Sequence, residues 1–185
     1  MATKHAATRA ARPCELGFSL LEAAVVVAIV AIVGASALPS FSALIDARRL
    51  DSAATRLAAD LQLARSEAIA RNQPLRLSLF TGSGASCWIV HSGAAADCRC
   101  SDAAGAVCGA GARTVKGVVL ANGERVSVAG NVASIVFDPL PGTSTPTGTL
   151  RLVGARGGAV HHVVNVAGRV RSCSPDGAVP GYSPC

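Results

Sequence analysis

The N-terminal part of the chain contains one long apolar run, FSLLEAAVVVAIVAIVGASAL, at residues 18–38. Its 21 residues carry a single charge, and such a run is long enough to cross a bilayer as a helix. Lys4, Arg9 and Arg12 precede it, and basic residues on this side place the N-terminus in the cytoplasm. The pattern therefore predicts a membrane helix over residues 18–38, with the rest of the chain on the outer side.

A helical pattern continues through residues 39–73. Pro39 is expected to end or kink the membrane span, but apolar residues then recur at intervals of three and four. The resulting stripe consists of Leu50, Ala54, Leu57, Leu61, Ala64 and Ala68. Glu67 and Arg71 stand at i, i+4 in the favourable order, and Pro74 follows the helix. We expect an amphipathic helix that packs this stripe on a following domain.

After Pro74 the pattern changes to short runs of β type between turn residues. These runs cover residues 75–80, 87–91, 115–120, 124–129, 133–138, 148–153, 159–166 and 169–173. The segments between them contain Gly, Pro, Ser and Asn. Residues 74–185 are therefore expected to form an antiparallel sheet or a small sandwich that packs on the helix, which makes the chain an α+β protein.

The composition indicates that the chain is basic and that its C-terminal part lies in an oxidising compartment. The 185 residues have a formal net charge of +6 and a pI of about 9.3, which favours anionic partners such as nucleic acid or a lipid surface. Of the seven cysteines, only Cys14 lies near the start. The other six are Cys87, Cys98, Cys100, Cys108, Cys173 and Cys185. An even set in one region is typical of disulfides in an oxidising compartment, provided that Cys14 is removed.

Residues 92–114 form an insert rich in Ala, Gly and Cys. The insert has little apolar surface to bury, so we expect disulfides to hold it. Six cysteines allow 15 connectivities, and the sequence does not choose among them. We favour Cys173–Cys185, which closes a terminal loop, with Cys87 and Cys108 bonding within the insert.

No catalytic or metal-binding set stands out. A zinc site made of the insert's cysteines and His91 is the alternative to disulfides, but the CxxC spacing of structural zinc sites is absent. His161 and His162 face opposite sides of a strand and cannot ligate one metal together without distortion. The sequence has no GxSxG, HExxH or P-loop motif. We expect neither an enzyme nor a metal or other cofactor.

The residues GFSLLE at the start of the apolar run resemble the type IV prepilin signal, in which a basic leader, a glycine and an apolar helix with a glutamate follow in fixed order. The resemblance implies that a prepilin peptidase removes residues 1–17 by cleaving between Gly17 and Phe18, and that Phe18 is N-methylated. Glu22, whose insertion in an apolar environment costs about 2.5–3.5 kcal/mol, would pair with the N-terminal amine of a neighbouring subunit. Cleavage also discards Cys14 and leaves 14 basic and 10 acidic residues, a net charge of +4.

A second resemblance lies at residues 64–79, ARSEAIARNQPLRLSL. This stretch is similar to the helix end and first strand of the FimT/GspH family of minor pilins and pseudopilins. The stretch FDPLPG…TGTLRL resembles the same family more loosely. Within the helix we interpret Arg65 and Glu67 as solvated charges.

The candidate binding residues are Gly168, Arg169 and Arg171, in GRVR. On a strand, arginines at i, i+2 project from one face about 6.6 Å apart, and both guanidinium groups can reach phosphates of one backbone. The ordinary interpretation is a pair of edge-strand arginines that discourage aggregation. GRVR, however, resembles the GRxR motif of FimT-type minor pilins, whose members implicated in natural transformation bind DNA through it. The basic residues that could widen this patch are Arg113, Lys116, Arg151 and Arg156.

These resemblances imply a FimT-like minor pilin, held by a single span in the inner membrane with its C-terminal domain in the periplasm before assembly. In a type IV pilus it would bind extracellular double-stranded DNA for natural transformation, mostly through phosphates and with weak sequence preference. The alternative is a structural role without DNA binding, as a GspH-like pseudopilin of a type II secretion system or a minor pilin that primes assembly. The expected partners are DNA, other pilin or pseudopilin subunits, the prepilin peptidase and the inner membrane.

Overall fold

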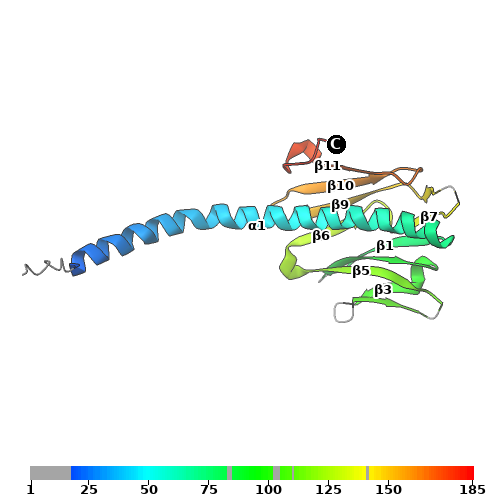
Figure 1. Cartoon of the computed structure of the whole chain (residues 1–185), viewed down its shortest axis with the longest axis horizontal. Coiled ribbons are helices and arrows are strands. Elements are labelled where there is room, and N and C mark those ends of the chain that lie inside the picture. The colour runs from blue at the N-terminus through cyan, green and yellow to red at the C-terminus, as the bar shows by residue number, and fades with distance from the viewer. Residues whose placement is uncertain (1–17, 83–84, 102–104, 110, 141) are drawn as a thin grey trace, which may run out of the picture. The chain divides into compact units, whose positions relative to one another are not determined.

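The structure is a computed structural model. It describes residues 18–82, 85–101, 105–109, 111–140 and 142–185, without the side chains of residues 36–40, 122 and 176. The chain divides into two compact units, Met1–Ser40 and Phe41–Cys185. Helix α1 (Leu20–Arg71) begins in the first unit and ends in the second, so Pro39 does not end the helix (Figure 1).

In the first unit, Ser19 caps the start of α1. Its Oγ accepts a hydrogen bond from the backbone N–H of Glu22 at 3.2 Å, which satisfies one of the free amides of the first turn. Every described side chain from residue 18 to residue 35 is exposed, with Phe18 at 79% and Leu20 at 89%. A helix that is apolar on all sides needs lipid or other chains around it. None of the described helical segments has the combined length and hydropathy that a bilayer crossing requires.

The second unit continues from the helix into β-structure. Its described strands are β1 (Leu75–Thr81), β2 (Ala85–His91), β3 (Cys98–Ser101), β4 (Gly105–Cys108), β5 (Thr114–Ala121), β6 (Val126–Gly130), β7 (Ser134–Phe137), β8 (Ser144–Thr145), β9 (Gly148–Gly154), β10 (Ala159–Val164) and β11 (Val170–Cys173). Each of the eight predicted strands corresponds to one of these, and β3, β4 and β8 were not predicted. The α+β fold is therefore confirmed.

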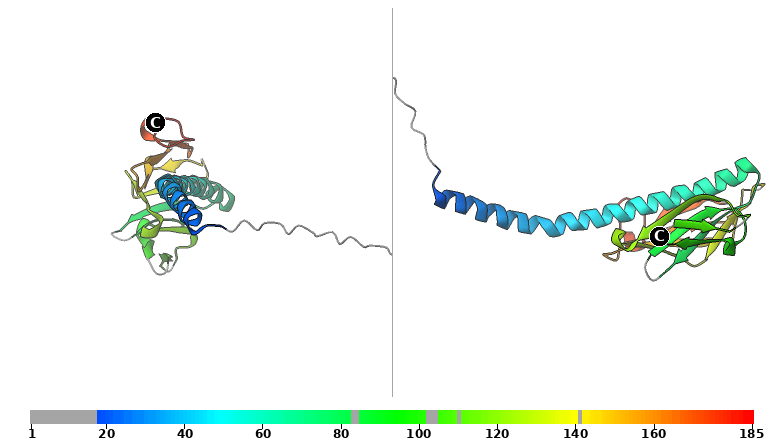
Figure 2. Two further views of the ribbon diagram at one scale, coloured as in Figure 1. Left: turned by 90° about the vertical axis from the view of Figure 1, so that its left-hand side faces the viewer. Right: turned by 90° about the horizontal axis from the view of Figure 1, so that it is seen from below.

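Both larger sheets pack on α1. One has the order β5-β2-β1-β7-β8 and the other β11-β10-β9-β6, and within the second unit both lie on the same side of the helix (Figures 1 and 2). All six residues of the predicted stripe are at most 3% exposed, and they share one core with residues of both sheets such as Trp88 and Phe137. The apolar stripe therefore faces the sheets, as its spacing predicted.

The insert packs on the five-stranded sheet as the hairpin β3–β4. Cys98–Cys108 joins the two hairpin strands, and Cys87–Cys100 ties the hairpin to β2. These residues form a small second core with Ile89. The thiols are oxidised to disulfides, so they are not available as the zinc ligands of the alternative interpretation.

The third disulfide is Cys173–Cys185, the pairing expected from the sequence. It closes a C-terminal lobe that also contacts the helix. The Tyr182 hydroxyl donates a hydrogen bond to Asp51 Oδ1 of α1 at 2.9 Å, and Val179 is buried in the main core. The lobe is therefore fixed at both the sheet and the helix.

One ion pair lies between α1 and the five-stranded sheet. Asp60 is fully buried, its Oδ2 accepts a hydrogen bond from Trp88 Nε1 at 2.7 Å, and its Oδ1 pairs with Lys116. A buried carboxylate is costly unless it is paired and hydrogen-bonded, so both partners have a structural role. Lys116 is therefore occupied here and does not widen a phosphate-binding patch.

Candidate nucleic-acid interface

The GRVR motif begins in the turn after β10, with Gly168 and Arg169, and continues into β11, with Val170 and Arg171. The turn is closed by a hydrogen bond from Gly168 N to Asn165 O at 2.9 Å. The prediction that the last strand starts at Arg169 is wrong, because β11 begins at Val170. The Asn165 side chain explains the difference, since its Oδ1 accepts the Arg169 N–H at 3.0 Å in place of a ladder bond.

Ser144 of β8 fixes this turn to the five-stranded sheet. Its backbone N–H donates to Val166 O at 2.9 Å, and its Oγ donates to Asn165 O at 2.6 Å. Ser144 is buried, so water does not compete for these bonds. The turn that carries the motif is thus attached to both sheets and is a rigid support for the arginines that follow it.

Gly168 is required in this turn for two reasons. Its φ of +68° lies in the left-handed region, which favours glycine, and the residue is buried. A Cβ at this position would lie 2.8 Å from Gly142 O and 2.9 Å from Arg65 Nε. The glycine of the motif therefore permits the close approach of two other segments, one of them α1.

Arg65 reaches this turn from the helix. Its Nε donates a hydrogen bond to Gly142 O at 2.9 Å, and the residue is half-buried. The interpretation of Arg65 as a solvated helix charge is therefore wrong, because the side chain spans from α1 to the loop before β8. For Glu67 the expected i, i+4 ion pair with Arg71 is present.

Arg169 and Arg171 are both exposed. Within the described residues, neither guanidinium group forms an ion pair or donates a hydrogen bond. The cross-strand register places Arg171 opposite Val163 of β10, whose side chain is also exposed. Arg171 therefore projects from the sheet face that points away from α1, with its donors available to a ligand.

The same outer face carries Arg151. Register places Arg151 of β9 opposite His161 of β10, two residues along the strand from the partner of Arg171. Burial, and then the charge of Arg151, lower the pKa of His161, which favours the neutral form of the ring. None of the residues that register places on this face in the described strands is acidic; they are Ser127, Ala129, Thr149, Arg151, Val153, Ala159, His161, Val163, Arg171 and Cys173. The face therefore favours an anionic partner.

The other basic residues that could widen the patch do not lie on this outer face. Arg156 pairs with the buried carboxylate of Asp46 at 3.1 Å. Arg113 comes directly before β5, in the other sheet. Of the four basic residues proposed from the sequence, only Arg151 lies on the outer face of the four-stranded sheet.

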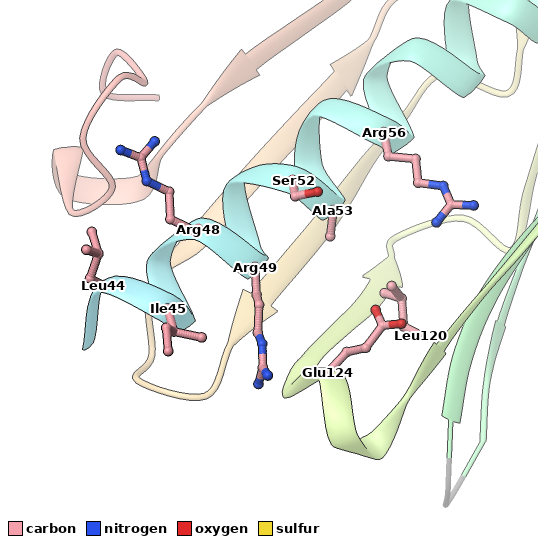
Figure 3. A pocket seen from close by; sticks show the side chains of 9 residues that line it. All are labelled: Leu44, Ile45, Arg48, Arg49, Ser52, Ala53, Arg56, Leu120 and Glu124. Carbon is pink, nitrogen blue, oxygen red and sulfur yellow. The ribbon is translucent and has the colours of Figure 1, made fainter. Parts of the chain in front are cut away.

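Another group of basic residues lines a pocket on α1, at the start of the second unit. Its volume is about 420 Å³, and it is lined by Leu44, Ile45, Arg48, Arg49, Ser52, Ala53, Arg56, Leu120 and Glu124. Figure 3 shows Arg49 and Arg56 pointing to the side on which Glu124 lies, whereas Arg48 points away. Because the Glu124 carboxylate opposes a bound phosphate there, the turn with Arg169 and Arg171 is the stronger candidate for an anion-binding site.

Comparison with known proteins agrees with this fold. The family profile described as "Type II transport protein GspH" matches residues 53–168, and that of the "Prokaryotic N-terminal methylation motif" matches residues 12–38. The first match covers more than half of the chain and ends at Gly168, so Arg169 and Arg171 lie beyond it.

Among solved structures, the type IV minor pilin FimU of Pseudomonas aeruginosa strain PAO1 is similar in two crystal forms. The form in space group P21 has 17% sequence identity and a TM-score of 0.50, with 69% of this chain and 93% of FimU covered. The form in P65 has 18% identity and a TM-score of 0.49, with 68% and 96% covered. At this identity the likeness concerns the fold alone. No curated protein sequence matches the chain.

Proposed function

This chain belongs to the GspH family of minor pilins and pseudopilins, and we propose that it is a minor type IV pilin that binds extracellular DNA through Arg169 and Arg171. One observation carries the proposal. Two exposed guanidinium groups without partners among the described residues follow a rigid turn, beside a sheet face that has no acidic residue in its described strands. Such a pair attracts polyanions and has five N–H donors on each side chain to offer to phosphate oxygens.

Binding of this kind is directed at the DNA backbone. Arginine forks match the geometry of phosphate and hold it by charge-assisted hydrogen bonds. The residues around the two arginines, Val166, Ala167, Val170 and Ser172, include no aromatic side chain that would stack on bases. The interaction is therefore proposed to be weakly sequence-specific and sensitive to salt, which suits the uptake of DNA of any sequence.

The N-terminal region is proposed to provide membrane anchoring and assembly. Cleavage would separate Gly17, which lies outside the described residues, from Phe18, which would be methylated. The match to the N-terminal methylation motif and the exposed apolar surface of the first unit support this proposal. Glu22 is exposed, and within the described residues its carboxylate has no ion-pair partner, so the N-terminal amine of a neighbouring subunit can pair with it. Residues 18–38 would lie in the inner membrane first and in the filament afterwards.

The processing proposal predicts the mass of the mature chain. Protein purified from the membranes of cells with the prepilin peptidase should begin with an N-methylated Phe18, and protein from cells without the peptidase should keep Met1. Gly17→Val should block the conversion, because it replaces the glycine after which cleavage is proposed with a larger, β-branched residue. Intact mass spectrometry with sequencing of the N-terminal peptide reads the result. An unprocessed Met1 in cells with active peptidase would contradict the proposal.

The DNA proposal predicts a loss of binding when the arginine pair is removed. Arg169→Ala with Arg171→Ala should weaken the binding of the full chain, in a nonionic detergent, to fluorescent duplex DNA at low salt. The expected loss is at least about 100-fold, because two charge-assisted contacts disappear. Fluorescence anisotropy measures it.

A matched control removes two exposed arginines elsewhere. Arg48→Ala with Arg56→Ala causes the same change in net charge in the pocket of Figure 3, and its affinity should stay within about twofold of the wild-type value. Equal losses in the two double variants would assign binding to net charge and not to the motif. Unchanged binding by the Arg169 and Arg171 variant would refute the site.

A second candidate function is that of a minor pseudopilin. The observation that favours it is the match to a family described as a type II transport protein, which ends before Arg169. In this role the chain would assemble into a secretion pseudopilus, and the arginines would serve as edge-strand charges that prevent pairing with other sheets. Failure of the wild-type chain to bind duplex DNA at low salt would favour this function.

A further inference from the structure

We propose that helix α1 and the motif turn form a second phosphate-binding site, with Arg65 and Arg169 as its two cations; the inference rests on the proposed DNA binding. The site is an open groove of about 540 Å³, which we call the helix–turn groove. It is lined by Gln62, Arg65, Ser66, Ile69, Gly168, Arg169 and Val170. The groove is large enough for a phosphate group with its neighbouring sugars, and its lining comes from two elements that are about 100 residues apart in the sequence.

The helix side of the groove follows from its periodicity. Gln62, Ser66 and Ile69 have the spacing of one helix face, and Arg65 lies between them. On the other side, Gly168 has no side chain, so the turn lies against this face. Any larger residue there would meet the Arg65 side chain, whose Cδ is 3.0 Å from the position of a Cβ. The glycine thus creates the groove as well as the turn.

Arg65 is held in a fixed orientation. Its Nε is occupied by the carbonyl oxygen of Gly142 at 2.9 Å. Within the described residues the two terminal nitrogens have no hydrogen-bond partner, so the guanidinium group can donate them to a ligand while the Nε bond keeps its plane fixed. An arginine that is ordered before binding loses less side-chain entropy when it contacts a phosphate.

The charges around the groove also favour an anion. Its lining contains two arginines and no acid. Glu67, on the same helix, is paired with Arg71 and does not line the groove. The exposed amide of Gln62 adds a neutral donor at the open side. The site therefore has a cation held in place by a hydrogen bond, an exposed cation without a partner among the described residues, and an amide donor around one open space.

The groove extends the path of the DNA backbone. Arg169 lines the groove, and Arg171 projects from the adjacent sheet face, so one strand can contact both places. A backbone that enters the groove meets Arg65 and Arg169, and its next phosphates meet Arg171 and then Arg151. The inferred footprint thus runs from the helix over the edge strand β11, and Arg65 is a binding residue that the motif does not include.

The test uses the full chain in nonionic detergent with fluorescent duplex DNA. Arg65→Ala is expected to weaken binding about tenfold, and the slope of log Kobs against log salt should become less steep by about 0.9, the value for one lost phosphate contact. Arg65→Lys should recover part of the affinity, because it keeps the charge but not the fixed fork. Arg56→Ala is the control, because Arg56 is exposed on the same helix, lies outside the groove and has no ion-pair partner among the described residues; its affinity should stay within about twofold of wild type.

A second pair of variants covers the case in which Arg65→Ala disturbs the turn. Gln62 is exposed, so Gln62→Glu places a carboxylate in the groove without a change in the core. It should weaken binding about tenfold relative to Gln62→Ala, which loses only the neutral amide donor and should itself bind a few-fold more weakly than wild type. If the two Gln62 variants bind DNA equally well while the Arg169 and Arg171 double variant still loses binding, the groove is not a phosphate-binding site. The proposed function would then still stand. A wild-type chain that does not bind DNA would overturn both.

Discussion

Replacing Lys116 by methionine is expected to lower the free energy of unfolding by about 2–3 kcal/mol. The Asp60 carboxylate is 1% exposed, and Lys116 is the cation that pairs with it. Without this cation, the carboxylate remains buried with only the Trp88 indole as a hydrogen-bond donor. Removal of one partner of a fully buried pair costs about 3–5 kcal/mol, but the Lys116 side chain is 38% exposed, so water replaces part of its contribution.

Urea unfolding of residues 41–185 measures this loss through Trp88, the one tryptophan of the chain. The fragment contains every buried residue of the main core. Asp60→Asn is the matched background, because an amide oxygen still accepts the Trp88 hydrogen bond but carries no charge. In that background Lys116→Met should cost less than about 1 kcal/mol. A loss of the same size in both backgrounds would show that Lys116 acts through packing and not through the ion pair.

Acidification from pH 7 to pH 4 is expected to remove about 3 kcal/mol of stability through His162 alone. His162 of β10 is fully buried, its Nδ1 lies 2.8 Å from Ser172 Oγ, and burial lowers its pKa from 6.5 to about 4. Between these two values the unfolded chain binds a proton that the folded chain does not. The stability is therefore complete above pH 6.5 and declines as the pH falls toward 4.

His162→Leu isolates this contribution. The variant loses the contact with Ser172, so its free energy of unfolding at pH 7 should be lower than that of wild type. Between pH 7 and pH 4, however, the free energy of unfolding of the variant should fall by about 3 kcal/mol less than that of wild type. His161→Ala, one residue away on the outer face, should keep most of the wild-type pH dependence and lose only the smaller part that the lowered pKa of His161 contributes. Urea titrations across this range measure both. A His162→Leu variant with the wild-type pH dependence would contradict the assignment.

Much of the fold could be predicted because its signals are local. The spacing from Leu50 to Ala68 fixes one helix face, and alternating runs between turn residues mark eight strands. The strands β3 and β4 gave no such signal, since residues 98–108 are mostly small residues and cysteines, and disulfides hold the two strands. In β8, two residues are too few for any pattern.

The candidate site was predictable only in part. Resemblance identified Arg169 and Arg171, but the position of Arg169 before the strand depends on the side chain of Asn165, which a periodicity does not reveal. The contact of Arg65 with Gly142 joins segments 77 residues apart, and neither residue shows it in its local sequence. Lys116 is among the residues that could widen the patch because its charge can be read from the sequence, whereas its pairing with the buried Asp60 cannot.

The salt dependence of DNA binding tests the proposed site most directly. The observed association constant of wild type and of the Arg169→Ala, Arg171→Ala double variant is measured for the same duplex at increasing salt. If both arginines contact phosphates, the wild-type slope of log Kobs against log salt is steeper than that of the double variant by about 1.8, which corresponds to two released counterion sites. Equal slopes for the two proteins would show that these arginines do not contact the DNA backbone.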